Sequence, residues 1–422
     1  AKKVAAKKVA AKKVESKEEE KPTLEPRPRK LVRPDKPVKL TIFVKKQRQN
    51  LLDLRDELMD AMYGVQQEAL RNGPEGSEAS GSGMHQGDAG SDAYDRARQL
   101  LNPRVNRYPA LVVQPAVPND VSHAVRLARQ ENLVTAVKCG GHSFRGDSSC
   151  DGGMQIDLSR LRGVRVDPSR RTAWVAGGSL LGDLDAEAMA KGLVTTAGSV
   201  SHTGVGGLTL GGGFGRLGRR FGLTIDNLLS VDIVTADGEL RHANEAENPD
   251  LFWGVRGGGG NFGVVTAFEF KLHPMERQVI SGSYGFPFEQ AQQVIEFAGE
   301  FATEAPDTLQ VVPFLGAFPG KDPVCNISIV YSGPADKADE LLAPIEKAGT
   351  VVRNSVKAWD YVALQKSGDQ TDFRANGAYI KSGFVNQVTP GFVRDLVETF
   401  QPHPGRATWM ALGQSGGAIN RV

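Results

Sequence analysis

The chain has 422 residues, of which 40% are hydrophobic and 24% charged, and its formal net charge is +2. That length suffices for two to three average domains with a proper core. No stretch approaches the about 18 apolar residues of a membrane-spanning helix, and no apolar run of a secretory signal follows the lysine-rich start. Cys139, Cys150 and Cys325 include no CxxC pair, which excludes a disulfide framework and a structural zinc site. We therefore expect a cytoplasmic protein without a metal site or a membrane segment.

Positive charge is concentrated at the start of the chain. Residues 1–48 contain 17 Lys and Arg against 6 Asp and Glu, a net charge of +11, so the rest carries −9. The unit AKKVA recurs there, and a run rich in Lys, Glu and Pro follows. Such a segment buries too little apolar area to offset the entropy of ordering. We predict a disordered basic arm, which is either a solubilising tail or a place of loose contact with nucleic acid.

A different pattern occupies residues 49–100. Apolar residues recur there at three- and four-residue spacing: Leu51, Leu54, Leu58, Met62 and Val65. This spacing predicts an amphipathic helix over 49–72, which Asn72-Gly73-Pro74 ends. A loop rich in Gly and Ser follows, and then a second short helical segment at 92–101.

From Tyr108 the pattern becomes that of a globular protein. We expect strands at 110–114, 134–138, 154–158, 172–176, 228–235 and 264–272, and helices at 120–128 and 180–191. Period-two alternation in 264–272 places Phe268 and Phe270 on one face. After Pro274 we expect helices at 289–301, 336–347 and 392–400 and strands at 309–315, 324–331 and 409–412. This order predicts a second, α+β domain.

Glycine gathers in one part of the chain: residues 140–263 hold 27 of the 49 glycines. They form clusters at 140–141, 204–213 and 257–263. Consecutive glycine N–H groups make concave anion sites, and the missing β-carbons let a phosphate approach the backbone. The clusters are either tight turns alone or the cradle of a long ligand such as a dinucleotide. The chain has no GxxxxGK[ST] and no GxGxxG within a βαβ unit, so neither a P-loop nor a Rossmann site is predicted.

Residues 137–146, VKCGGHSFRG, closely resemble the flavin-attachment loop of the FAD-linked oxidases of the vanillyl-alcohol oxidase/p-cresol methylhydroxylase (PCMH) superfamily. The resemblance continues, in the family's order, through 198–215, 226–238 and 250–266. Within that superfamily, these four segments look most like the berberine-bridge-enzyme and oligosaccharide-oxidase branch. It implies an α+β fold, with a PCMH-type FAD-binding domain of two subdomains at 101–274 and a substrate domain at 275–422.

The same resemblance implies the residues of a flavin site. His142 matches the histidine that bonds to the flavin 8α-methyl, and Val200 stands where some members carry a second attachment cysteine, so one covalent bond is expected. His202 either faces the flavin or is polar filler. The other implied FAD contacts are Gly140, Gly141, Ser143 and Phe144 at the pyrophosphate, Gly198, Ser201, Gly206 and Gly207 along the flavin and ribityl chain, and Asn261, Gly263 and Val265 on the other side.

The implied activity is that of an FAD-dependent oxidase. A hydride would pass from an alcohol, a sugar or an activated C–H group to a covalently bound flavin, which molecular oxygen reoxidises. Residues 379–384 and 416–421 match segments of the family's substrate domain. The family's later Tyr-x-Asn segment and its catalytic base have no counterpart before Val422, so we expect a C-terminally truncated substrate domain and assign no catalytic residue. The alternative is an FAD-binding fragment without turnover.

A second resemblance concerns the N-terminal part. Residues 49–96, especially 73–80 and 88–96, look like the first half of a DksA/TraR-type protein, which inserts a coiled coil into RNA polymerase. Asp88, Asp92 and Asp95 would then match acidic residues near the coiled-coil tip. The second coiled-coil helix and the zinc-finger cysteines of that family have no counterpart here. The alternatives are an RNA polymerase-binding segment and a plain amphipathic helix with an acidic loop.

Overall fold

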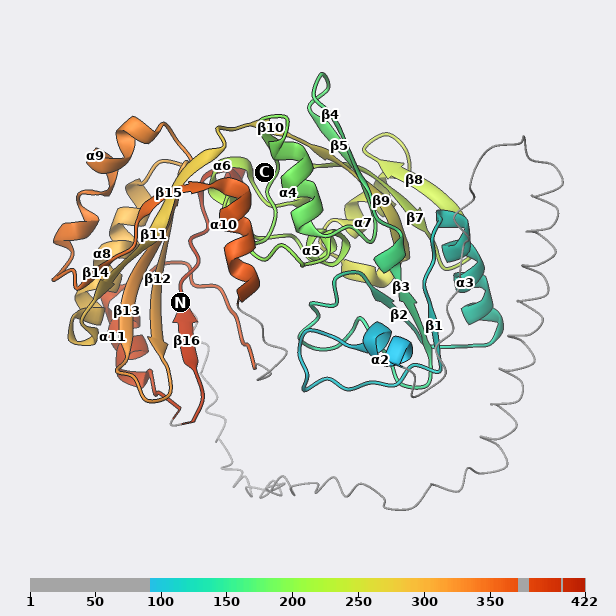
Figure 1. Cartoon of the computed structure of the whole chain (residues 1–422), viewed down its shortest axis with the longest axis horizontal. Helices are drawn as coiled ribbons and strands as arrows, with labels where there is room; N and C mark the ends of the chain where they lie inside the picture. The colour runs from blue at the N-terminus through green and yellow to red at the C-terminus, as the bar shows by residue number, and fades with distance from the viewer. Residues whose placement is uncertain (1–91, 371–378, 404, 422) are drawn as a thin grey trace, which may run out of the picture. The chain divides into compact units, whose positions relative to one another are not determined.

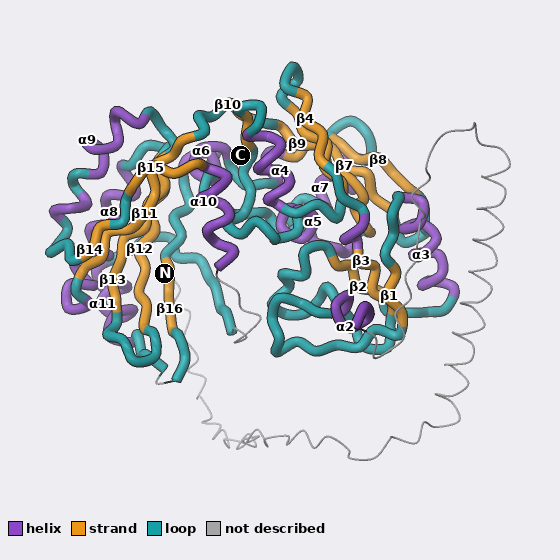
Figure 2. The backbone as a smooth tube through the Cα atoms, viewed as in Figure 1, coloured by secondary structure: helices purple, strands orange, loops and turns teal. Residues whose placement is uncertain are grey.

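The structure, a computed structural model, describes residues 92–370, 379–403 and 405–421 (Figures 1 and 2). The predicted basic arm at 1–48 and the predicted helix at 49–72 lie outside these residues. Within the described ranges, no helix has both the length and the apolar character needed to cross a bilayer.

The first sheet has three parallel strands in the order β1 (Leu111–Val113), β3 (Met154–Asp157), β2 (Thr135–Lys138). Parallel strands need a crossover connection, and α3 (Pro118–Gln130) supplies it between β1 and β2. Val121, Ala124 and Ala128 of this helix are buried against Met154 and Ile156 of β3. The strand that leads into the first glycine cluster is therefore anchored in a packed layer.

The second sheet has five antiparallel strands. Their order is β4 (Val164–Asp167), β5 (Thr172–Ala176), β9 (Val264–Lys271), β7 (Leu228–Val234), β8 (Leu240–Asn244). In the central strand, Phe268 and Phe270 share a face as predicted, with ring centroids 5.8 Å apart. Both pack in one core with α4 (Leu181–Met189), α5 (Val205–Leu210) and α7 (Pro249–Val255).

A third, antiparallel sheet forms the second half. Its order is β14 (Arg353–Asn354), β11 (Gln278–Phe286), β13 (Val324–Tyr331), β12 (Leu309–Ala317), β16 (Thr408–Ala411), and β15 (Lys357–Asp360) also pairs with β11. One face packs against α8 (Ala291–Glu304), α9 (Ala338–Leu342) and α11 (Pro390–Thr399), which lie together on one side of the sheet in Figure 1. The predicted α+β fold is confirmed.

Helix α10 (Tyr361–Ser367) lies on the opposite face of this sheet. Tyr361 and Leu364 pack there with Val279 of β11, and the same cluster contains Met189 and Leu217 from the first half. The two halves therefore share part of their core. The boundary between 274 and 275 stays a prediction.

Some elements differ from the sequence expectation. The predicted helix at 336–347 is broken into α9 and two 3₁₀ turns, at Ala335–Lys337 and Ile345–Lys347, because Pro344 has no N–H to donate to a continuous helix. Strand β11 was not predicted, since Gly282 and Gly285 interrupt its pattern. The remaining elements are α2 (Asp92–Arg98), α6 (Gly218–Phe221), β6 (Leu193–Val194), β10 (His273–Pro274) and the 3₁₀ helices η1 (Leu158–Arg160), η2 (Ile225–Asn227), η3 (Gly259–Phe262), η4 (Phe288–Gln290), η7 (Gly368–Gln370) and η8 (Gly417–Arg421).

Candidate flavin-binding site

The three glycine clusters predicted from the sequence meet around the short helix α5. Gly140, two residues beyond β2, lies against Gly204, which precedes α5: a β-carbon on Gly140 would overlap the backbone nitrogen of Gly204, and one on Gly204 would overlap that of Gly140. On another side, α5 packs beside η3 of the third cluster. Backbone contact between loops far apart in the chain thus requires glycine at both positions.

His142 and His202 are direct partners. Nε2 of His142 lies 2.7 Å from Nδ1 of His202, with the ring centroids 4.7 Å apart, and the tautomers decide which nitrogen donates. Oγ1 of Thr203 lies 3.3 Å from Nδ1 of His142. The ring of His202 thus contacts the residue predicted to hold the flavin, and both alternatives for His202, facing the flavin or polar filler, stay predictions.

The shape of the loop after His142 is fixed by local hydrogen bonds. Gly141 has a left-handed φ of 71°, which glycine adopts without strain. The Ser143 hydroxyl accepts the backbone N–H groups of Gly146 and Asp147, at 3.1 and 2.9 Å. The Asn102 side chain donates to the carbonyl oxygen of Phe144 at 3.1 Å. The predicted pyrophosphate loop is thus held in one conformation by side chains on both sides.

Space for a ligand lies beside α5 and the third cluster. Gly207 is exposed on α5, and a β-carbon there would meet no atom within 4 Å; the same holds for Gly257, Gly259 and Gly260. The hydroxyls of Ser148 and Ser149, just after the attachment loop, are buried and have no partner among the described residues. Open glycine backbone and unsatisfied hydroxyls suit a phosphate-bearing cofactor, so these residues fit FAD.

Two other glycines of the predicted site are needed for packing. A β-carbon on Gly198 would lie 2.9 Å from Leu181, and one on Gly206 would lie 3.1 Å from the carbonyl oxygen of Gly177. Both glycines are buried. Their side-chain positions face protein, so they shape the loop and leave only backbone atoms for a cofactor.

The residues predicted on the other side of FAD differ among themselves. Asn261 is exposed, and its amide donates to the carbonyl oxygen of Gly258 at 2.8 Å. Gly263 has a φ of 143°, and a β-carbon there would overlap the carbonyl oxygen of Val234. Val265 is 4% exposed and belongs to the core. Val265 would meet FAD through its backbone, whereas Asn261 presents a side chain.

Sequence reasoning missed a buried polar cluster behind the segment 198–201. Gln365 of α10 donates to the carbonyl oxygen of Gly198 at 2.7 Å and to the Asp185 carboxyl at 3.2 Å. Arg216 donates to Gln365 at 2.7 Å and to the carbonyl oxygen of Ser199 at 3.1 Å. Burial raises the pKa of Asp185 to about 7 and lowers that of Arg216. The one signal of this cluster in the sequence was Asp185, an acidic residue on the apolar face of the predicted helix 180–191.

Asp369 was also missed, and it is bound to a predicted site residue. Ser201 donates its backbone N–H to Oδ1 of Asp369 at 2.7 Å and its hydroxyl to Oδ2 at 2.6 Å. Asp369 lies in η7, directly after α10. A residue of the second half thus holds the segment that carries His202.

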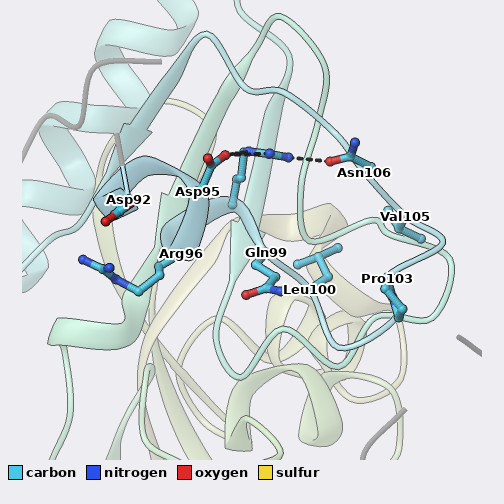
Figure 3. Close-up of a pocket in the computed structure, with 9 residues that line it drawn as sticks. Asp92, Asp95, Arg96, Gln99, Leu100, Pro103, Val105 and Asn106 are labelled. Carbon is cyan, nitrogen blue, oxygen red and sulfur yellow. Dashed lines mark hydrogen bonds and ion pairs between the residues drawn. The ribbon is translucent and has the colours of Figure 1, made fainter. Parts of the chain in front are cut away.

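The pocket in Figure 3 lies on α2 and the segment after it, and it places two residues of the second resemblance. Its volume is about 330 Å³, and Asp92, Asp95 and Arg98 line it. Arg98 binds Asp95 at 2.7 Å and Asn106 at 2.6 Å. The rest of the DksA/TraR-like segment, with Asp88, lies outside the described residues, and contact with RNA polymerase has no support in the described part.

Several known proteins are similar to this chain. The model of a family described as "FAD binding domain" matches residues 109–244. An FAD-linked oxidoreductase of Dictyostelium discoideum is 32% identical over 346 residues, which cover 78% of this chain and 72% of that protein. The (R)-6-hydroxynicotine oxidase of Paenarthrobacter nicotinovorans is 31% identical over 274 residues, which cover 64% of this chain and 59% of that protein.

A solved structure shares the fold. The glucooligosaccharide oxidase of Acremonium strictum superimposes with a TM-score of 0.69 at 24% identity, over 81% of this chain and 75% of that one. The likeness extends beyond the FAD-binding residues into the second half. Together with the identity and coverage of the Dictyostelium relative, the site and the fold lead to one conclusion: the chain belongs to the FAD-linked oxidoreductases.

Proposed function

We propose that the chain is an FAD-dependent oxidase whose flavin is bound covalently through His142. It would take a hydride from an alcohol, a sugar or an activated C–H group, with molecular oxygen as the acceptor. The observation that carries the proposal is the position of His142, directly after the first glycine cluster, which contacts the second cluster through Gly140 and Gly204, and 2.7 Å from His202. Two similar proteins are named oxidases, and the FAD of one of them is 6-S-cysteinyl and 8α-N1-histidyl.

The chain's own residues would bind and orient the cofactor. The backbone of Gly140, Gly141, Ser143 and Phe144 would hold the pyrophosphate, with Gly207 and Asn261 at the open surface beside α5. Bound FAD would supply the hydride acceptor, while the protein supplies orientation and electrostatics. A neutral imidazole is a competent nucleophile, and the contacts of His142 hold its ring in one place.

A single covalent bond follows from the side chain at position 200. Val200 offers no sulfur where a second attachment would need one. Cys139 lies near the loop, but burial raises the pKa of its thiol, which disfavours the nucleophilic thiolate. We therefore propose one bond, through His142.

The linkage is tested by acid precipitation and mass spectrometry of the purified full chain. We expect a yellow protein whose flavin stays in the pellet and adds the mass of one FAD to the peptide that contains His142. His142→Ala should release its flavin into the supernatant. The matched control is His242→Ala, because His242 bonds to Asp232 on the second sheet, at 2.7 Å, away from the glycine clusters. Release of FAD from the unmodified protein would contradict covalency and leave FAD binding in place.

The oxidase reaction needs a separate test. A panel of alcohols, sugars and amines, added without oxygen, should bleach the flavin absorption for a substrate of this enzyme. Admitting air should restore the absorption and release one hydrogen peroxide per flavin reduced. A bleached flavin that stays reduced in air would assign the chain to the dehydrogenases instead.

A further inference from the structure

The carboxylate of Asp369, in the second half of the chain, holds a residue of the predicted flavin site. We infer that Asp369 is a positioning residue for flavin attachment, acting through Ser201 and His202 on His142. This inference rests on the covalent linkage proposed above. Its starting point is the pair of hydrogen bonds, at 2.7 and 2.6 Å, through which the Asp369 carboxylate holds the backbone and the hydroxyl of Ser201.

The segment 198–201 is held at Gly198, Ser199 and Ser201 by residues from other parts of the chain. Gln365 and Arg216 donate to its first two carbonyl oxygens, at 2.7 and 3.1 Å. Gly368 lies against the same carbonyl oxygen of Ser199 that Arg216 binds, since a β-carbon on Gly368 would overlap it. Asp369 then fixes Ser201. The Gly182 N–H also donates to the carbonyl oxygen of Ser201, at 2.8 Å. Together these contacts leave the segment little freedom, so α10 and η7 help to set the direction in which the next residue points.

That next residue is His202. Asp369 accepts hydrogen bonds from both the N–H and the hydroxyl of Ser201. The residue directly before His202 is therefore held in place. The ring reaches His142, with Nδ1 at 2.7 Å from Nε2. Losing the Asp369 contacts would leave Ser201 held only through its carbonyl oxygen, which accepts the Gly182 N–H at 2.8 Å. The His202 ring could then shift relative to His142, while the Gly140–Gly204 contact would stay.

The contact between the two histidines matters for the chemistry of attachment. One bond forms, between a ring nitrogen of His142 and the carbon of the flavin 8α-methyl. The methyl C–H bond breaks and its two electrons pass to the flavin ring, the imidazole loses its N–H proton, and molecular oxygen takes up the two electrons and two protons as hydrogen peroxide. Nδ1 of His202 lies 2.7 Å from Nε2 of His142. When Nδ1 of His142 forms the bond, His202 can therefore accept the proton that leaves Nε2.

The test separates FAD binding from FAD attachment. The full chain is produced without flavin in a riboflavin-requiring host and then mixed with FAD. Quenching of FAD fluorescence gives the dissociation constant, and flavin that becomes acid-stable with time gives the attachment rate. We expect Asp369→Ala to slow attachment about tenfold to hundredfold, the size of effect that a small misplacement of reacting groups produces, with the dissociation constant changed less than about twofold. Asp369→Asn should lie in between, because one oxygen remains to accept from Ser201.

Asp360→Ala is the matched control. Asp360 caps the other end of the same helix, where its carboxyl accepts the Ala363 N–H at 3.0 Å. It destabilises α10 without touching Ser201, so its attachment rate should match that of the unmodified chain. Equal slowing in both variants, or joint loss of FAD affinity and thermal stability in Asp369→Ala, would make Asp369 merely structural and overturn the inference.

The outcome also distinguishes the two proposals. If the unmodified chain never forms acid-stable flavin, the linkage through His142 is wrong and the role of Asp369 falls with it. If the unmodified chain does so and Asp369→Ala attaches FAD at the same rate, the linkage stands and the inference alone is wrong.

Discussion

Gly140 and Gly204 lie in backbone contact, although 64 positions separate them in the sequence, and neither has room for a β-carbon. This contact joins the loop of His142 to the loop of His202. The 2.7 Å contact between the two imidazoles depends on it. Glycine at these positions thus serves the protein's own packing before it serves a cofactor.

Gly140→Ala should therefore destabilise the protein even without FAD. The added methyl overlaps the backbone of Gly204, and overpacking of this kind costs about 1–3 kcal/mol. Urea unfolding of the flavin-free chain measures the change as a lower midpoint. An unchanged midpoint would show that the two loops separate at little cost.

Gly207→Ala should have the opposite profile. Gly207 is exposed on α5 with empty space around its β-carbon position, and replacing glycine by alanine in a helix gains up to about 1 kcal/mol. The flavin-free protein should be as stable as before or more so, while the flavin-to-protein absorbance ratio after purification falls, because the methyl occupies space assigned to FAD. The control is Gly391→Ala on α11, where a β-carbon would meet only Arg394 at 3.9 Å. Full flavin content in Gly207→Ala would remove Gly207 from the site.

Asp185→Asn should change how stability depends on pH. Burial raises the pKa of Asp185 from 3.8 to about 7. Between these values the unfolded chain releases the proton and the folded chain keeps it, so the free energy of unfolding falls by about 1.4 kcal/mol per pH unit. The free energy of unfolding is highest below pH 4 and falls as the pH rises through 7. At about 1.4 kcal/mol per pKa unit, the total loss is about 4 kcal/mol. Asparagine cannot ionise and keeps an oxygen for Gln365.

Unfolding in urea at pH 4, 6 and 8 measures this effect. The free energy of the variant relative to the unmodified chain should rise steadily with pH and level off above pH 7. Glu187→Gln, an exposed position of the same helix, is the control and should follow the unmodified chain. Parallel curves for Asp185→Asn and the unmodified chain would mean that the carboxyl does not stay protonated on folding.

Deleting residues 1–48 should leave the flavin site intact. The contacts described for the site run from Leu101, whose N–H donates to Gly141 at 2.9 Å, to Asp369. The net charge of +11 and the lack of apolar periodicity give the deleted arm nothing to dock with. Flavin content and absorption spectrum should match those of the full chain, and a loss of flavin would assign the arm a structural role.

Local patterns predicted most of the first half of the fold. Strand β5 and the end of β2 follow from short apolar runs bounded by glycine and turn residues, and the attachment loop follows from residues adjacent in the sequence. The predictions weakened where a partner overrides the local pattern. Strand β11 carries two glycines, and it forms because β13 and β15 pair with it on its two sides.

In the candidate site, too, residues within a local motif could be predicted, whereas residues that act through distant partners could not. His142 was identifiable because its loop is a contiguous motif, whereas the role of His202 depends on a contact across 60 positions. Asp369 was beyond reach, since its partner Ser201 lies 168 positions earlier and no pattern around residue 369 marks it. Gln365 likewise reads as an ordinary helix residue until the fold brings it to Gly198.

The 168 positions between Ser201 and Asp369 also set an order of events during synthesis. At about 5–20 residues per second, the ribosome adds that stretch in roughly ten to thirty seconds. From residue 263 onward in that interval the nascent chain has all three glycine clusters, but it still lacks the Asp369 carboxylate and the Gln365 amide that hold segment 198–201. The flavin loops therefore reach their final geometry late, after the second half has emerged, and a chain stalled before residue 361 would carry His142 in a site that is not yet closed.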